Sequence, residues 1–233
     1  ENPLLSGRLS LPDAEDQAWL ASLDYLHFPP RVVPEEKVLP DLKPVDDPLS
    51  DVNPASVPPL DFSVAELKIG EQLLGEFSFQ LRPDAAGANI ANFRMSSQDS
   101  SITDLAGTGG ANIDWRYAAG MHTSSFNGLF SAGNLARVMP QWGHDALAES
   151  NSGRFTGTLQ WAGSPLAFAL SASSGQIQMD IRNGRFVDIN SGGSRLLGVF
   201  NFDALVRRLQ LDFSDIYQRG FAFDTITGNL MFA

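Results

Sequence analysis

The side chains best suited to acid–base or metal chemistry are few and lie far apart in the chain. None of the three histidines, His27, His122 and His144, has a second ligand at a metal-binding spacing such as H-x-x-x-H. A structural or surface role is therefore the stronger interpretation for each histidine. The sequence predicts no metal site.

Carboxylates and glycine-rich stretches also fall short of a catalytic set. Asp212 and Asp215, with Asp224 further on, could act as paired carboxylates, but acidic residues near a sheet edge are usually solvated or cap a turn. A hydrolase that uses Asp212 and Asp215 is therefore the weakest alternative. The glycines of 107–110 lead into a strand-like run instead of a helix, so they favour a turn over a phosphate loop. We expect neither an enzyme nor a bound cofactor.

The composition limits the class of protein and its partners. Of 233 residues, 43% are hydrophobic and 18% are charged, a globular balance that excludes disorder throughout. The formal net charge of −11 disfavours nucleic acid as a partner, because phosphate binding needs clustered Lys and Arg. No cysteine is present, which excludes disulfides and thiolate sites. The sequence contains no apolar run of about 20 residues and no charged-then-apolar leader. Because it opens abruptly on ENPLLSGRLSLP and stops at LMFA within a strand-like run, we interpret it as a segment of a longer protein.

Apolar and polar residues alternate along several stretches after the first 60 residues, and a period of two is typical of strands with one buried face. The clearest runs cover 76–82, 111–117 and 176–182. About ten such strands at a spacing of ~4.8 Å predict a twisted, mainly antiparallel sheet roughly 50 Å across. The Asn183-Gly184 pair predicts a type I′ hairpin turn, since both central positions of that turn need positive φ. The apolar positions of the alternating runs are Phe77, Phe79, Leu81, Ile113, Trp115, Phe155, Leu159, Trp161, Leu166, Phe168, Leu170, Ile177, Met179 and Ile181.

Other segments interrupt this pattern. Residues 5–12 are strand-like, whereas 17–23 favour a helix. Nine of the 14 prolines lie between 29 and 60, where no apolar period exists, so we expect an extended connector at the surface. A proline-rich ligand for an aromatic groove is the weaker interpretation of that stretch. Helical spacing predicts two short helical inserts, in 133–142 and in 194–209.

Several motifs near the end of the chain carry a family resemblance. They are W-A-G-S-P at 161–165, N-G-R at 183–185, R-L-L-G at 195–198, R-R-L-Q-L-D-F at 207–213 and G-F-A-F-D-T-I-T-G at 220–228. In this order the motifs resemble the C-terminal region of AsmA-like proteins of the YhdP branch. The earlier part of the chain matches more loosely. Ser194 stands where the family often has a glycine, which affects only the cap of the following helix.

The resemblance implies a function in lipid transfer. It implies a parent protein that is anchored in the inner membrane by an N-terminal helix outside this chain and that reaches through the periplasm toward the outer membrane. Phospholipids would move along a groove formed by the sheet, and the apolar positions of the alternating runs named above are the candidates that line this groove. Envelope proteins of both membranes are further candidate partners. The helix in 194–209 would cap the groove through Leu196, Leu197, Phe200 and Leu205.

We therefore expect a twisted antiparallel sheet curled into an open groove. The expected parts are a strand and helix segment of a preceding repeat (1–28), a proline-rich acidic connector (29–60) and a β-groove domain (61–233). Alternation alone leaves a second architecture open, because a closed core also needs one apolar face per strand. In that case the chain would be a non-catalytic scaffold of the cell envelope.

Overall fold

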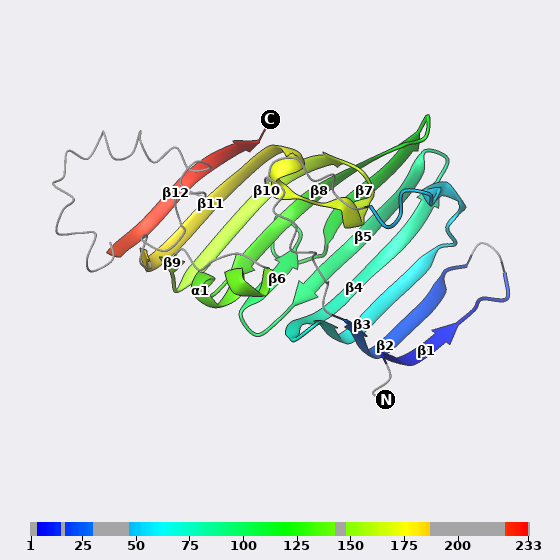
Figure 1. Ribbon diagram of the computed structural model, residues 1–233, viewed down its shortest axis with the longest axis horizontal. Helices are drawn as coiled ribbons and strands as arrows, with labels where there is room; N and C mark the ends of the chain where they lie inside the picture. Colours follow the sequence, from blue (N-terminus) through cyan, green and yellow to red (C-terminus); the bar gives the residue numbers. More distant parts are fainter. Residues whose placement is uncertain (1–3, 15–16, 30–46, 143–147, 187–221, 233) are drawn as a thin grey trace, which may run out of the picture. The chain divides into compact units, whose positions relative to one another are not determined.

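The computed structural model describes residues 4–14, 17–29, 47–142, 148–186 and 222–232, which form a mainly β structure. Twelve described strands belong to one mixed sheet in the order β1-β2-β3-β4-β5-β6-β8-β10-β11-β12, with β7 paired to β5 and β8, and β9 paired to β11 (Figure 1). The strands are β1 (Leu5–Ser10), β2 (Trp19–Phe28), β3 (Leu60–Ile69), β4 (Gln72–Asp84), β5 (Gly87–Ser96), β6 (Ser100–Thr103), β7 (Ala111–Ala118), β8 (Met121–Ala132), β9 (Ala148–Glu149), β10 (Ser152–Ala162), β11 (Ser173–Phe186) and β12 (Ala222–Phe232).

The chain divides into two compact units. Unit 1 comprises Glu1–Phe130, Thr156–Ile177 and Met231–Ala233, and unit 2 comprises Ser131–Phe155 and Gln178–Leu230. The domain boundaries expected from the sequence, after residues 28 and 60, stay a prediction.

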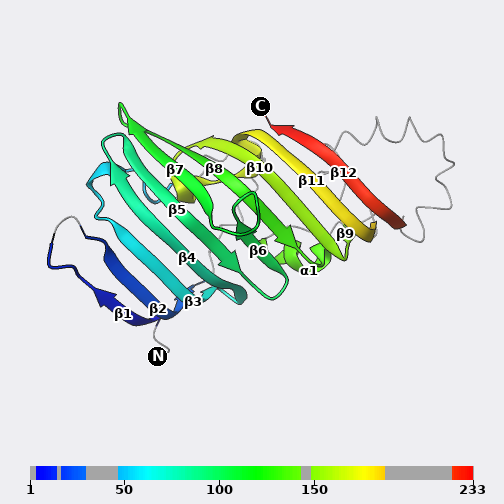
Figure 2. The same ribbon diagram turned by 180° about the vertical axis from the view of Figure 1, so that it is seen from behind.

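In unit 1, β2 is a strand where the sequence favoured a helix over 17–23, and it pairs in parallel with β3. Pairing with a neighbour on each side outweighs the weak helical spacing of this segment. A parallel pair needs a connection of a dozen or more residues, and the proline-rich stretch supplies it. The pairs β1–β2, β3–β4, β4–β5, β5–β7 and β7–β8 are antiparallel as predicted (Figure 2).

The register of unit 1 gathers apolar side chains on one face of the sheet. Phe62 of β3 lies opposite Phe79 of β4, and their rings stack at 5.0 Å between centroids. Further along the ladder, Ile90 of β5 lies between its partners Leu81 and Ile113. Because side chains alternate across a strand, each aligned pair extends the same apolar row.

The stretch after β10 is not the strand that its alternation predicted. Two 3₁₀ turns, η3 (Pro165–Ala167) and η4 (Leu170–Ala172), replace it, and Ser164 caps the first turn by accepting a hydrogen bond from Leu166 N. Pro165 lacks the N–H that a ladder needs, which favours the turn. As a result Leu166, Phe168 and Leu170 are 59%, 48% and 40% exposed.

Unit 2 contains the predicted insert, as helix α1 (Leu135–Val138) followed by the 3₁₀ turn η2 (Met139–Trp142). Asn134 caps α1, and Leu135 and Val138 are buried. Asn183 has a φ of 48° as expected, but it lies inside β11. Asn151 N donates to both Arg182 O and Asn183 O, so the positive φ serves a bulge and not a hairpin turn.

The second predicted insert, over 194–209, lies outside the described residues. So do its groove-capping candidates Leu196, Leu197, Phe200 and Leu205, as well as Asp212, Asp215 and His144.

Candidate functional site

The apolar face of unit 1 has a fully buried part. Its cluster lies on β4, β5, β7 and β10, and every member is at most 9% exposed. Close packing of this kind is typical of a protein interior. The cluster consists of Leu81, Ala88, Ile90, Ile113, Trp115 and Trp161.

Residues 47–59 cover this cluster, and we call them the strap. Leu49, Val52 and Val57 of the strap pack against the cluster, and Pro54 is buried. The strap and the turns after β10 lie on the same side of the sheet, which is the near side in Figure 1. Part of the stretch that the sequence predicted as an extended surface connector is therefore packed on the core.

Asp47 fastens the first residue of the strap to the turn after β10. Its carboxylate accepts hydrogen bonds from Ser164 Oγ (2.6 Å), Ser164 N (2.8 Å) and Leu49 N (3.0 Å). Burial raises the pKa of Asp47, but these hydrogen bonds outweigh burial and hold the pKa below its ordinary value of 3.8. Trp161 Nε1 in turn donates to Ser164 O at 2.8 Å, so this anchor is tied to the buried cluster.

His122 forms a second anchor. It is 8% exposed, and Trp115 Nε1 donates to its Nδ1 at 3.0 Å. An indole N–H can only donate, so Nδ1 accepts and Nε2 carries the proton of the neutral ring. His122 Nε2 then donates to Ser50 O of the strap at 2.9 Å. These two hydrogen bonds give His122 a structural role, as the sequence favoured.

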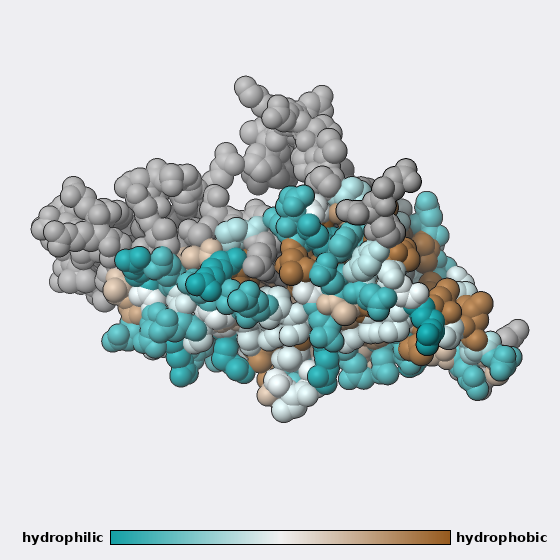
Figure 3. Space-filling view, turned by 90° about the horizontal axis from the view of Figure 1, so that it is seen from below, coloured by the Kyte–Doolittle hydropathy of each residue, from teal (hydrophilic) through white to brown (hydrophobic). Residues whose placement is uncertain are grey.

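The same apolar face is open over the first strands. Leu9 of β1 lies beside Ala21, which lies beside Phe62, and Trp19 of β2 lies beside Leu60. Leu9 is 58% and Trp19 is 37% exposed. Figure 3 shows apolar side chains at the surface over β1 to β3. The face thus runs from a covered part under the strap to an accessible part over β1–β4.

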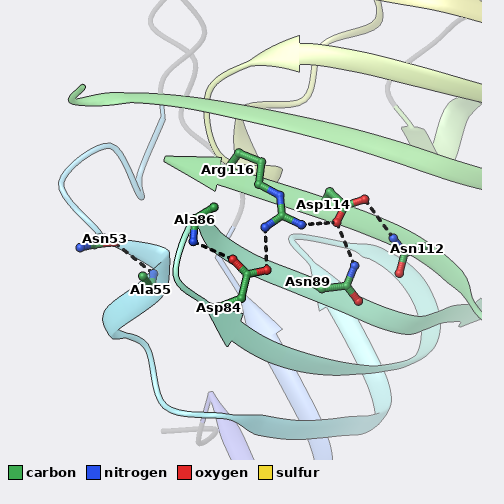
Figure 4. Close-up of polar contacts among 8 residues, drawn as sticks. All are labelled: Asn53, Ala55, Asp84, Ala86, Asn89, Asn112, Asp114 and Arg116. Atoms are coloured by element: carbon green, nitrogen blue, oxygen red, sulfur yellow. Dashed lines mark hydrogen bonds and ion pairs between the residues drawn. The ribbon is translucent and has the colours of Figure 1, made fainter. Parts of the chain in front are cut away.

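The opposite face of unit 1 is polar. Arg116 of β7 pairs with Asp84 (2.6 Å) and Asp114 (2.9 Å), and Asn89 donates to Asp114 at 3.0 Å (Figure 4). The hydrogen bonds from Arg116 and from Ala86 N hold the pKa of Asp84 below its ordinary value. A sheet with one apolar and one polar face can shield apolar material on one side while the other side stays in water.

The structure distributes the predicted apolar residues unevenly. In unit 1, Leu81, Ile113, Trp115, Leu159 and Trp161 are buried, whereas Phe77, Phe79 and Ile177 are half-buried. In unit 2, Met179 and Ile181 are buried and Phe155 is half-buried. Which of these residues contact a ligand stays a prediction.

Sequence reasoning missed the anchors Asp47, Ser50 and Ser164. One signal was available, because Ser164 precedes Pro165 and this pair is typical of a capped turn. Asp47 gave no signal, since its partner lies 117 residues further along the chain.

Two further features were sought in the described part of the chain, a metal-ion site and a membrane-spanning helix. No three His, Cys, Asp or Glu side chains gather there in a way that could hold a metal ion. No described helix is long and apolar enough to cross a membrane.

Comparisons with known proteins agree with the geometry. The chain is 24% identical over 211 residues to the intermembrane phospholipid transporter YhdP of Escherichia coli (strain K12), covering 89% of this chain and 16% of that protein. The chain thus spans about one sixth of the length of this relative. No solved structure matches. The family model described as YhdP protein matches residues 1–233, so the chain belongs to the YhdP family.

Proposed function

We propose that this chain is a periplasmic segment of a lipid-transfer protein and that its apolar sheet face shields phospholipid acyl chains between the inner and outer membranes. The observation that carries the proposal is the one-sided sheet of unit 1, with Phe62 and Phe79 on the apolar face and Arg116 on the polar face. The relative named as an intermembrane phospholipid transporter supports the choice of ligand.

Such a face removes the main barrier to lipid transfer. Two tails of about sixteen carbons exposed to water cost about 0.8 kcal/mol per CH₂, or roughly 25 kcal/mol in all. An apolar face that accompanies the tails removes most of this cost, while the headgroup stays in water. The proposal needs no catalytic step, and binding needs only to be reversible.

Site-specific photo-crosslinking tests which face meets the lipid. A photoreactive amino acid replaces Phe79 on the apolar face or, as the matched control, its neighbour Ser78 on the opposite face. The protein is mixed with phosphatidylethanolamine vesicles and irradiated, and the adducts are identified by mass spectrometry. We expect lipid adducts at position 79 and at least about tenfold fewer at position 78. Equal labelling at both positions, or none at 79 in the folded protein, contradicts the proposal.

A scaffold of the cell envelope with a closed β core is the second candidate. The strap favours it, because it covers Ile113, Trp115 and Trp161 as a core layer would. Native mass spectrometry of the purified chain separates the two functions. Phospholipid that co-purifies with the chain supports lipid transfer, whereas a lipid-free chain that retains envelope proteins supports the scaffold.

A further inference from the structure

The strap occupies part of the face that the proposed function assigns to acyl chains. Leu49, Val52 and Val57 place aliphatic groups on the buried cluster, which is the chemistry that a lipid tail would offer there. Without the strap, the cluster would lose the aliphatic cover that Leu49, Val52 and Val57 give it. In this structure, aliphatic side chains of the strap therefore occupy the place on the sheet that an acyl chain would take.

The strap is built so that it can leave without losing its own hydrogen bonds. Its turns close on themselves, because Val52 N donates to Leu49 O and Val57 N donates to Pro54 O. Asn53 caps the second turn by accepting from Ala55 N (Figure 4). Four prolines, at positions 48, 54, 58 and 59, limit the conformations that a released strap would gain.

The strap is held to the sheet at two polar points near its start and at a third point at its end, where Pro59 O accepts from Trp19 N at 2.7 Å. Asp47 accepts from Ser164, and Ser50 O accepts from His122. Both of these strap groups, the Asp47 carboxylate and the Ser50 carbonyl oxygen, can find water when the strap lifts, since Ser50 is already exposed. The apolar cluster has no such alternative and needs an apolar replacement.

We propose that the strap is a displaceable cover of the lipid path, which occupies the apolar face over β5 and β7 when no acyl chain is bound and yields this face to an acyl chain. The proposal rests on the proposed function and adds its regulation. Exchange of one apolar occupant for another keeps the cluster dry throughout, because the strap leaves only as a tail replaces it. Lipid would enter over β1–β4, where the face is already accessible, and would then advance under the strap.

A reversible lock tests this proposal, since the chain has no native cysteine. Asp47 Oδ1 and Ser164 Oγ are 2.6 Å apart. A cysteine is one atom shorter than an aspartate, so the two sulfurs of D47C/S164C face each other across a slightly wider gap, which a small movement of the strap closes to form the disulfide. Reduction of this variant leaves the strap without its carboxylate anchor, and mild oxidation locks it. The matched control is S22C/S63C, whose native Oγ atoms lie 3.5 Å apart on the polar face.

The readout is labelling of β7 by phospholipid with a photoactivatable acyl chain, carried in phosphatidylethanolamine vesicles and mapped by mass spectrometry. We expect labelling of β7 to be highest in reduced D47C/S164C, intermediate in the native chain and at least about tenfold lower in the oxidised variant. Labelling of β3 and β4 should persist in all three. Oxidation of S22C/S63C should change nothing.

Each other outcome contradicts the proposal in a different way. Equal labelling of β7 in the locked and released forms shows that the strap does not cover a lipid path. Labelling of β3 and β4 without any labelling of β7 shows that the face under the strap is a permanent core, while the proposed function survives. No labelling of any strand in any form overturns the proposed function and the cover together. Far-UV circular dichroism establishes that each variant is folded.

Discussion

Asp47 holds the strap through hydrogen bonds that require its ionised form. Its pKa in the folded chain lies below 3.8, so the folded state binds a proton more weakly than the unfolded state. The stabilisation is therefore complete above the unfolded pKa near 4 and is lost as the pH falls through the lower folded-state pKa. A hydrogen bond to a charged acceptor contributes more stability than one to a neutral acceptor. D47N should therefore lower the free energy of unfolding at pH 7 by about 1–2 kcal/mol.

Urea unfolding, repeated at intervals of about half a pH unit between about pH 2.5 and 7, measures this effect. The dependence of stability on pH below about 4 should be shallower in D47N than in the native chain, because one linked proton has been removed. D51N is the matched control, since Asp51 is an exposed carboxylate of the same strap. A D47N profile that follows the native one over this range contradicts the role of Asp47 as an anchor.

His122 is the hydrogen-bond partner of both Trp115 Nε1 and Ser50 O. H122L removes the acceptor of Trp115 Nε1 and the donor to Ser50 O. A buried polar group without a partner costs about 1–3 kcal/mol, and Ser50 O can reach water, so we expect a loss of about 2–3 kcal/mol in unfolding free energy. The loss should appear in urea unfolding monitored by tryptophan fluorescence.

H27L provides the comparison with the same substitution at the surface. His27 Nε2 contacts Glu66 Oε1 at 2.8 Å with both side chains partly exposed, and such a pair contributes about 0–1 kcal/mol. Similar losses in H27L and H122L would mean that the contacts of His122 contribute no more than a surface pair.

At the scale of the elements, a bulge in β5 depends on Gly110, the residue immediately before the partner strand β7. The register of β5 shifts between Ile90 and Phe93, and Asn92 there has a φ of 52°. A Cβ on Gly110 would overlap the carbonyl carbon of Asn92, which is backbone and cannot swing aside. G110A should therefore cost about 3 kcal/mol in unfolding free energy, through forced movement of β5.

G120A separates this steric effect from backbone strain. Gly120 has a φ of 78°, but a Cβ there would meet nothing within 4 Å. Its substitution should cost only about 1 kcal/mol, the strain of a left-handed residue. Chemical denaturation of the two variants measures both values, and a G110A variant as stable as G120A would refute the close approach at the bulge.

The elements that the sequence predicts correctly are those specified by their own residues. The strands β4, β7 and β11 carry a period of two over seven or more residues, and the sequence predicted them from that alone. The same period continues at Leu166, Phe168 and Leu170, but this stretch is too short to specify a strand. Pro165 begins the first of two 3₁₀ turns there instead. Asn183 received the positive φ that its type favours, but the partner strand decided that it forms a bulge.

Features that depend on contacts between distant parts of the chain leave no local pattern in the sequence. The parallel pairing of β2 with β3 depends on a connection that passes through the proline-rich stretch, and composition alone suggested an extended connector there. Leu49, Val52 and Val57 have neither a strand nor a helix period, because the strap packs through turns. Both features depend on contacts between residues far apart in sequence, for which a single sequence carries no signal.

At the scale of the whole molecule, the proposed function predicts that the net charge sets how often the chain encounters a membrane and that the apolar face binds the acyl chains. The formal net charge of −11 repels anionic vesicles, and the repulsion extends about 30 Å at 0.01 M salt but only about 3 Å at 1 M. Acyl-chain burial has no such dependence, because it is apolar.

Transfer of a phospholipid with a fluorescent acyl chain from donor vesicles to the chain measures both effects. From anionic vesicles, uptake at 0.01 M salt should be at least about tenfold slower than at 1 M, since a repulsive field lowers the rate of encounter. From zwitterionic vesicles the rate should change less than about twofold over the same range. Faster uptake from anionic vesicles at low salt would require a basic docking patch and would contradict this account, because the chain would then recognise the headgroup charge of the membrane instead of the acyl chains alone.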